Sequence, residues 1–106
     1  MEQIVRSFPK VKLTLVGNGN ERSSLEKFAQ TKLPEGSVRF LSTIDRREIP
    51  KLLRAADLFV LPSLRESLPY AVIEAMTSGL SVVATNVGGL PELIIPDHGG
   101  LLVPPS

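Results

Sequence analysis

Apolar and polar positions along the chain follow two alternating periods, one typical of strands and the other of helices. Short apolar runs rich in β-branched residues stop at turn residues, as strands do; they cover residues 11–16, 38–41, 58–61, 81–85 and 101–103. Between them, apolar residues recur three and four positions apart, which predicts helices; these cover residues 21–31, 45–56, 68–78 and 90–94. Strands and helices in this order predict an α/β protein, a parallel sheet with helices on both faces.

Several local signals refine the predicted elements. Four consecutive apolar residues at 58–61 predict a strand that is buried on both faces. Asp45 and Glu48 have the spacing of a capping box at the start of a helix, and Pro50 predicts that this helix is kinked or begins later. Gly79 is expected to end the helix before it, because glycine accepts the left-handed conformation that follows a helix terminus.

Composition excludes several classes of protein. A chain of 106 residues predicts a single domain over residues 1–106. The net charge of +1 gives no electrostatic footprint for nucleic acid, so no nucleic-acid partner is expected. The chain has no cysteine and one histidine, His98, which predicts no metal site and no disulfide. Without a signal peptide or a long apolar run, it is expected to be cytoplasmic.

Two glutamates form the candidate site. Glu66 follows the strand that ends at residue 61, and Glu74 lies on the next helix, with seven residues between them. Ligands of parallel sheets bind beyond the carboxyl ends of the strands. The unpaired amides at the helix start, such as those of Leu68 and Tyr70, attract a phosphate. Carboxylates for hydroxyl groups on either side of an anion site match a sugar nucleotide.

A plainer explanation of the same residues stays open at this point. The helix dipole alone favours an acidic residue near a helix N-terminus, and Glu74 is then an ordinary exposed helix residue. Ser67 is then simply the N-cap. Gly88 and Gly89 either leave backbone room beside a ligand or start the short helix at 90–94.

A set of short motifs in a fixed order resembles one known family. The motifs include Pro62-Ser63-x-x-Glu66, Glu74-Ala75-Met76, Val82-Val83-Ala84-Thr85, Gly88-Gly89-x-Pro91-Glu92 and Gly100-Leu101-Leu102-Val103. Together they resemble the nucleotide-sugar half of retaining glycosyltransferases of family 4, also called group 1, which have the two-domain GT-B fold. The resemblance covers nearly the whole chain. It implies a Rossmann-like C-terminal domain that takes part in moving a sugar from a nucleotide donor to an acceptor, with no cofactor and no required metal.

The resemblance also implies roles for the two glutamates, which match the family's E-x7-E signature. Glu66 would face the hydroxyls of the transferred sugar and is the candidate catalytic residue. Glu74 would bind the ribose hydroxyls. Hydrogen bonds from a carboxylate that strengthen at an oxocarbenium-like transition state are a physically reasonable form of catalysis.

The remaining site residues follow from the same resemblance. The amides around Ser67, Leu68 and Tyr70 would hold the diphosphate, and the segment around Thr43 and Ile44 would lie near the base. The expected ligand is a UDP-, GDP- or ADP-sugar. Ser67 stands where the family usually has glycine, so its side chain is expected to crowd the closest approach of the phosphate.

The resemblance further implies that parts of the family's machinery are missing. An N-terminal acceptor domain and the first strand of the sheet are expected to be absent, so the isolated chain is not expected to be a working transferase. The gap would lie between the strands at 11–16 and 58–61. Direct pairing of these two strands, or self-association, is the expected remedy.

Other functions compete with sugar transfer. A non-catalytic α/β module of the signalling-receiver kind needs an acidic site at strand carboxyl ends, yet Asp57 precedes its strand. A folding or binding unit without activity is a further alternative. A sugar-nucleotide epimerase with the GT-B fold would need catalytic acids from a partner domain. Binding of nucleotide sugars would separate the receiver-like module from a transferase, and those catalytic acids would identify the epimerase.

Overall fold

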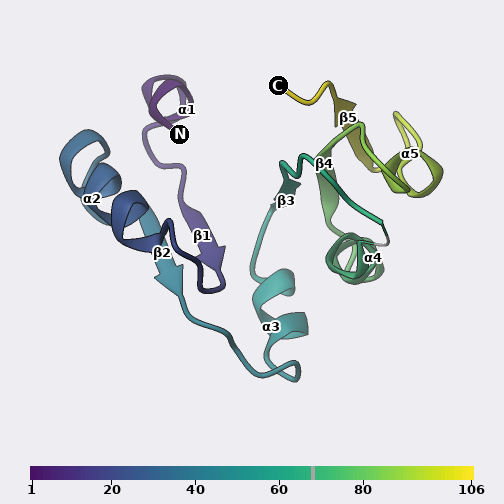
Figure 1. Cartoon of the computed structure of the whole chain (residues 1–106), viewed down its shortest axis with the longest axis horizontal. Coiled ribbons are helices and arrows are strands. Elements are labelled where there is room, and N and C mark those ends of the chain that lie inside the picture. The colour runs from purple at the N-terminus through teal and green to yellow at the C-terminus, as the bar shows by residue number, and fades with distance from the viewer. Residues whose placement is uncertain (68) are drawn as a thin grey trace. The chain divides into compact units, whose positions relative to one another are not determined.

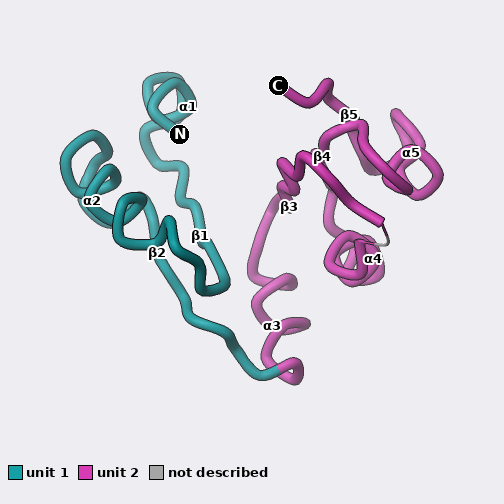
Figure 2. Tube along the Cα trace, viewed as in Figure 1, with its two compact units in different colours: residues 1–45 teal, residues 46–106 magenta. Residues whose placement is uncertain are grey.

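The computed structural model describes every residue of the chain except Leu68 (Figure 1). Helices and strands alternate from one end to the other. The chain divides into two compact units, residues 1–45 and residues 46–106 (Figure 2). The predicted single domain over residues 1–106 stays a prediction.

The first unit contains two helices and a two-stranded sheet: α1 (Glu2–Ser7), β1 (Leu13–Val16), α2 (Arg22–Lys32) and β2 (Val38–Leu41). The two strands run parallel, with Leu13 opposite Val38 and Val16 opposite Leu41. Parallel strands require a crossover connection, and α2 supplies it. Gly17 ends β1 at a φ of +130°, a backbone conformation that favours glycine.

The second unit contains three helices and a three-stranded parallel sheet: α3 (Ile49–Arg54), β3 (Leu58–Leu61), α4 (Tyr70–Thr77), β4 (Ser81–Thr85), α5 (Leu90–Leu93) and β5 (Gly100–Val103). The strand order is β3-β4-β5, so β4 is central and paired on both sides. All three carboxyl ends therefore lie at one edge of this sheet, where β4 ends at the buried Thr85.

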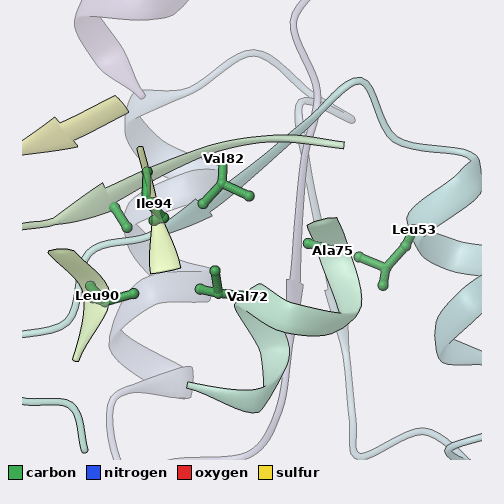
Figure 3. Packing of buried hydrophobic residues seen from close by; sticks show 7 residues of the cluster. Leu53, Val72, Ala75, Val82, Leu90 and Ile94 are labelled. Atoms are coloured by element: carbon green, nitrogen blue, oxygen red, sulfur yellow. The ribbon is translucent and has the colours of Figure 1, made fainter. Parts of the chain in front are cut away.

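The core of the second unit forms where α4 and α5 meet the central strand. Val72 and Ala75 of α4 are fully buried, as are Leu90 of α5 and Val82 of β4. Figure 3 shows Val72 and Leu90 close together, with Val82 and Ile94 beside them. Full burial of an aliphatic side chain contributes about 1.5–3 kcal/mol, so this cluster is the main source of stability that this unit has.

The predicted α/β class, with parallel strands that alternate with helices, is confirmed. Gly79 follows α4 at a φ of +84°, as predicted. The capping box at Asp45 is wrong: α3 is capped by Glu48 without any side-chain cap hydrogen bond. Pro50 lies in the first turn, because proline needs no amide partner there, and the predicted later start is confirmed.

One prediction about the strands is wrong. Leu58 and Val60 of β3 are each 49% exposed, so only the other face of this strand, with Phe59 and Leu61, packs on the core. Within each unit, every ladder joins strands that are consecutive in the chain. Direct pairing of the strands at 11–16 and 58–61, which belong to different units, stays a prediction, as does self-association.

Candidate functional site

Glu66 lies in the loop that joins the carboxyl end of β3 to the start of α4. Its side chain is half-buried. The hydroxyl of Ser63, three residues earlier, donates a hydrogen bond of 2.9 Å to Oε1 of this carboxylate. A carboxylate accepts several hydrogen bonds, so Oε2 and the remaining lone pairs stay available to a ligand hydroxyl. The geometry therefore gives the Glu66 carboxylate a defined position at the sheet edge.

The loop that carries Glu66 is tied to the central strand. Thr85, the last residue of β4, is 6% exposed, and its hydroxyl donates a hydrogen bond to the backbone carbonyl of Ser63. The three residues thus form a connected path from a buried hydroxyl, through Ser63, to the carboxylate of Glu66. The sequence motif contained Ser63 and Thr85, but no local signal revealed the contact, because 22 positions separate them.

Two glycines lie directly beneath this loop. Gly88 has a φ of +54°, and a Cβ atom built on it would lie only 1.7 Å from the backbone carbonyl oxygen of Glu66. A Cβ on Gly89 would lie 2.9 Å from the carbonyl oxygen of Ser67. The sequence left two explanations for this glycine pair. Gly89 starts the short helix, because it is the N-cap of α5. The backbone room that the glycines leave is occupied by the protein's own loop.

The start of α4 contradicts the simpler explanation, in which Ser67 is the N-cap of this helix. The N-cap is Pro69, without a side-chain cap hydrogen bond, so the side chain of Ser67 does not cap this helix. Ser67 is exposed, and Tyr70 is 65% exposed at the first helical position. The prediction for Leu68 lies outside the described residues. Glu74 follows one turn after Tyr70 and is half-buried.

Thr43 and Ile44 follow β2 in the first unit, whereas the two glutamates belong to the second. Thr43 is exposed and accepts a hydrogen bond of 3.4 Å from the amide of Asn18. Ile44 is half-buried. Their proposed place near a base stays a prediction.

Arg22 joins the two loops that follow β1 and β2. Its guanidinium donates to Asn18 at 2.9 Å and to Ser42 at 3.0 Å. Its Nε also pairs with Glu26 at 2.7 Å. These contacts tie both loops to the first turn of α2.

Two further properties concern the chain as far as the structure describes it. No group of three or more His, Asp or Glu side chains in this part is placed to hold a metal ion. Every helix among the same residues is too short or too polar to span a lipid bilayer.

Parallel strands alternating with helices define an α/β protein, a class in which ligands bind beyond the carboxyl ends of the strands. Glu66 lies at this edge of the sheet. The chain belongs to the family described as glycosyl transferases group 1, whose model matches residues 1–106. The family predicted from the motifs is thereby confirmed.

Individual relatives agree with the family. The chain is 34% identical to the sulfoquinovosyl transferase SQD2 of Arabidopsis thaliana over 94% of its own length and 19% of that protein. It matches the Anabaena protein Alr3699/HepE, solved in complex with UDP-glucose, at 32% identity and a TM-score of 0.82, over 92% of this chain and 28% of that chain.

A second similar structure is a C-terminal domain. The chain is 29% identical to the C-terminal domain of the glycosyl transferase group 1 family protein LpcC from Francisella tularensis, with a TM-score of 0.85. The match covers 99% of this chain and 57% of that chain. The chain therefore spans well under two thirds of the length of each of these relatives.

Proposed function

We propose that the chain binds a nucleotide-sugar donor, and that the complete protein moves the sugar to an acceptor with retention at the anomeric carbon. The observation that carries this proposal is the Glu66 carboxylate, held by Ser63 beyond the carboxyl end of β3 and followed by Glu74 on α4. Family membership over residues 1–106 gives the reaction class.

Each carboxylate has a distinct role in this proposal. Glu66 accepts hydrogen bonds from the hydroxyls of the transferred sugar, and these bonds strengthen as positive charge develops on the sugar ring. Glu74 pairs with the ribose hydroxyls. Both side chains are half-buried, so their hydrogen bonds are less exposed to competing water than those of a surface carboxylate.

The diphosphate lies between the two glutamates, at the start of α4. The amides around Ser67, Leu68 and Tyr70 are its proposed donors. The N-cap Pro69 makes no side-chain cap hydrogen bond among the described residues, which supports this proposal. Thr43 and Ile44 are the proposed neighbours of the base. The Anabaena neighbour in complex with UDP-glucose favours a UDP-sugar over a GDP- or ADP-sugar.

Transfer itself belongs to the complete protein in this proposal. The chain corresponds to 19% of the Arabidopsis relative and 28% of the Anabaena chain, and the acceptor site is assigned to an N-terminal domain. The domain formed by residues 1–106 is expected to bind donor without transferring sugar.

Saturation-transfer NMR against UDP-, GDP- and ADP-sugars tests the proposal, followed by calorimetry on Glu74→Gln. A carboxylate that pairs with two ribose hydroxyls contributes about 1.5–3 kcal/mol for each charged hydrogen bond. Glu74→Gln should therefore raise the Kd about tenfold or more. Glu48→Gln is the matched control, because it removes an equal charge from an exposed position of the same unit. An unchanged Kd in Glu74→Gln would contradict the ribose assignment.

A further inference from the structure

We propose that Ser63 is a positioning residue that orients the Glu66 carboxylate toward the sugar of the donor. This inference rests on the proposed function and adds to it a residue that never touches the ligand. Its basis is the path of hydrogen bonds from Thr85 through Ser63 to Glu66.

A free glutamate in a loop samples many side-chain rotamers, because three rotatable bonds separate its carboxylate from the backbone. The 2.9 Å bond from the Ser63 hydroxyl to Oε1 selects one of them. The carboxylate is a rigid plane, so a hydrogen bond that fixes Oε1 also fixes the direction of Oε2. Oε2 can accept a further hydrogen bond. A ligand hydroxyl then meets an acceptor that is already ordered.

Ser63 can orient another side chain only because its own backbone is fixed. The hydroxyl that holds its carbonyl belongs to Thr85, which is 6% exposed. Thr85 is β-branched and has restricted rotamers, and it lies at the end of the central strand, which is paired on both sides. The anchor is therefore among the best-supported polar groups of the second unit.

Gly88 gives a second restraint on the same loop. Its Cα hydrogen faces the carbonyl of Glu66, in a space that a Cβ would fill at 1.7 Å. Gly88 thus packs closely against the backbone of Glu66, and Ser63 fixes the side chain through a hydrogen bond. Two different segments of the chain therefore restrain the backbone and the carboxylate of Glu66.

The proposal predicts a selective effect on the sugar part of the donor. Calorimetry on the full chain compares UDP-glucose with UDP, which lacks the sugar. Ser63→Ala should raise the Kd for UDP-glucose about fivefold, as expected for a loss of order at one charged hydrogen bond. The Kd for UDP should change by less than about twofold on the same scale.

Ser63→Thr is the conservative rescue variant, since it keeps the hydroxyl. It should return the Kd for UDP-glucose to within about twofold of the wild-type value. Equal weakening of UDP-glucose and UDP in Ser63→Ala, or an unchanged Kd for both, would overturn the positioning role.

A ligand-independent measurement separates this inference from the proposed function. A double-mutant cycle of Ser63→Ala and Glu66→Ala in urea unfolding should show a coupling of about threefold or more in the unfolding equilibrium constant. If the wild-type chain binds neither UDP-glucose nor UDP, the proposed function fails, and the coupling alone decides whether Ser63 orients Glu66. Absence of coupling rejects the inference even where the donor binds.

Discussion

The two units of the chain differ in what holds them together. The seven buried side chains of the hydrophobic core cluster belong to the second unit, residues 46–106. The first unit, residues 1–45, buries only Ser37, and its larger apolar side chains, such as Phe8 and Phe28, are 67% and 44% exposed. A two-stranded sheet without a buried face has marginal stability in water. Both units alternate helices with strands, yet among the described residues only the second unit has a cluster of buried apolar side chains.

The difference bears on the proposed site. The loop of Glu66 rests on a central strand and a packed core, through Thr85 and Gly88. The loop of Thr43 receives hydrogen bonds from Asn18 to Thr43 and from Arg22 to Ser42. The proposed sugar and ribose contacts, Glu66 and Glu74, both lie in the unit that has the packed core.

The largest expected effect comes from a deletion in the core of the second unit. Leu90→Ala should lower the free energy of unfolding by about 4 kcal/mol, because Leu90 is fully buried and its removal leaves a cavity. Leu25→Ala on α2 is the matched deletion in the first unit; Leu25 is 45% exposed, so the loss should stay under about 1 kcal/mol. Urea unfolding followed by circular dichroism measures both. Equal losses would show that the apolar face of α2 is buried in solution.

A second prediction tests the contact beneath the Glu66 loop. Gly88→Ala should lower the free energy of unfolding by about 3 kcal/mol, for two reasons. Alanine is strained at the positive φ of this position, and its Cβ would overlap with the backbone carbonyl of Glu66. Gly99→Ala is the control: its φ is +89°, but nothing lies within 4 Å, so strain alone should cost about 1 kcal/mol. Thermal or urea unfolding of the two variants gives the difference. A Gly88 variant as stable as the Gly99 variant would contradict the close approach.

Much of the fold could be predicted because its signals are local. Apolar periodicity located the strands and the helices α2 to α5, though not α1, and Pro50 and Gly79 marked element ends through their own backbone preferences. Spacing and family motifs also led to Glu66 and Glu74.

What the sequence did not reveal depends on partners distant along the chain. The apolar run of β3 predicted burial on both faces, yet Val60 is 49% exposed, because burial depends on what covers a strand and not on its composition. The contact of Thr85 with Ser63 and the close approach of Gly88 to Glu66 join segments that only the fold brings together.

A third prediction concerns the polar contacts of the first unit. Arg22→Lys should lower the free energy of unfolding by about 1 kcal/mol, since an ammonium cannot reproduce the forked contacts to Asn18, Ser42 and Glu26. Amide hydrogen exchange should become faster in the two loops that Arg22 joins. Arg39→Lys, at an exposed position on β2, is the control and should leave exchange in these loops unchanged. Equal exchange in both variants would mean that the loops are ordered without Arg22.

The smallest expected effect separates two serines of one loop. Ser67→Gly should change the free energy of unfolding by only a few tenths of a kcal/mol, because Ser67 is exposed and its side chain does not cap α4. Donor binding should hold or strengthen, since glycine lets the phosphate approach the backbone more closely. Ser63→Ala in the same loop should instead weaken UDP-glucose binding, because only the Ser63 hydroxyl supports Glu66.

Calorimetry and urea unfolding on Ser67→Gly and Ser67→Ala test this contrast. The alanine variant removes the hydroxyl without adding backbone freedom, so a loss confined to the glycine variant would report flexibility of the loop. A clear loss of donor binding in both variants would mean that the Ser67 hydroxyl itself contacts the ligand. In that case the family's usual glycine is not equivalent to this serine, and side-chain recognition of the donor extends from Glu66 into the turn that leads to α4.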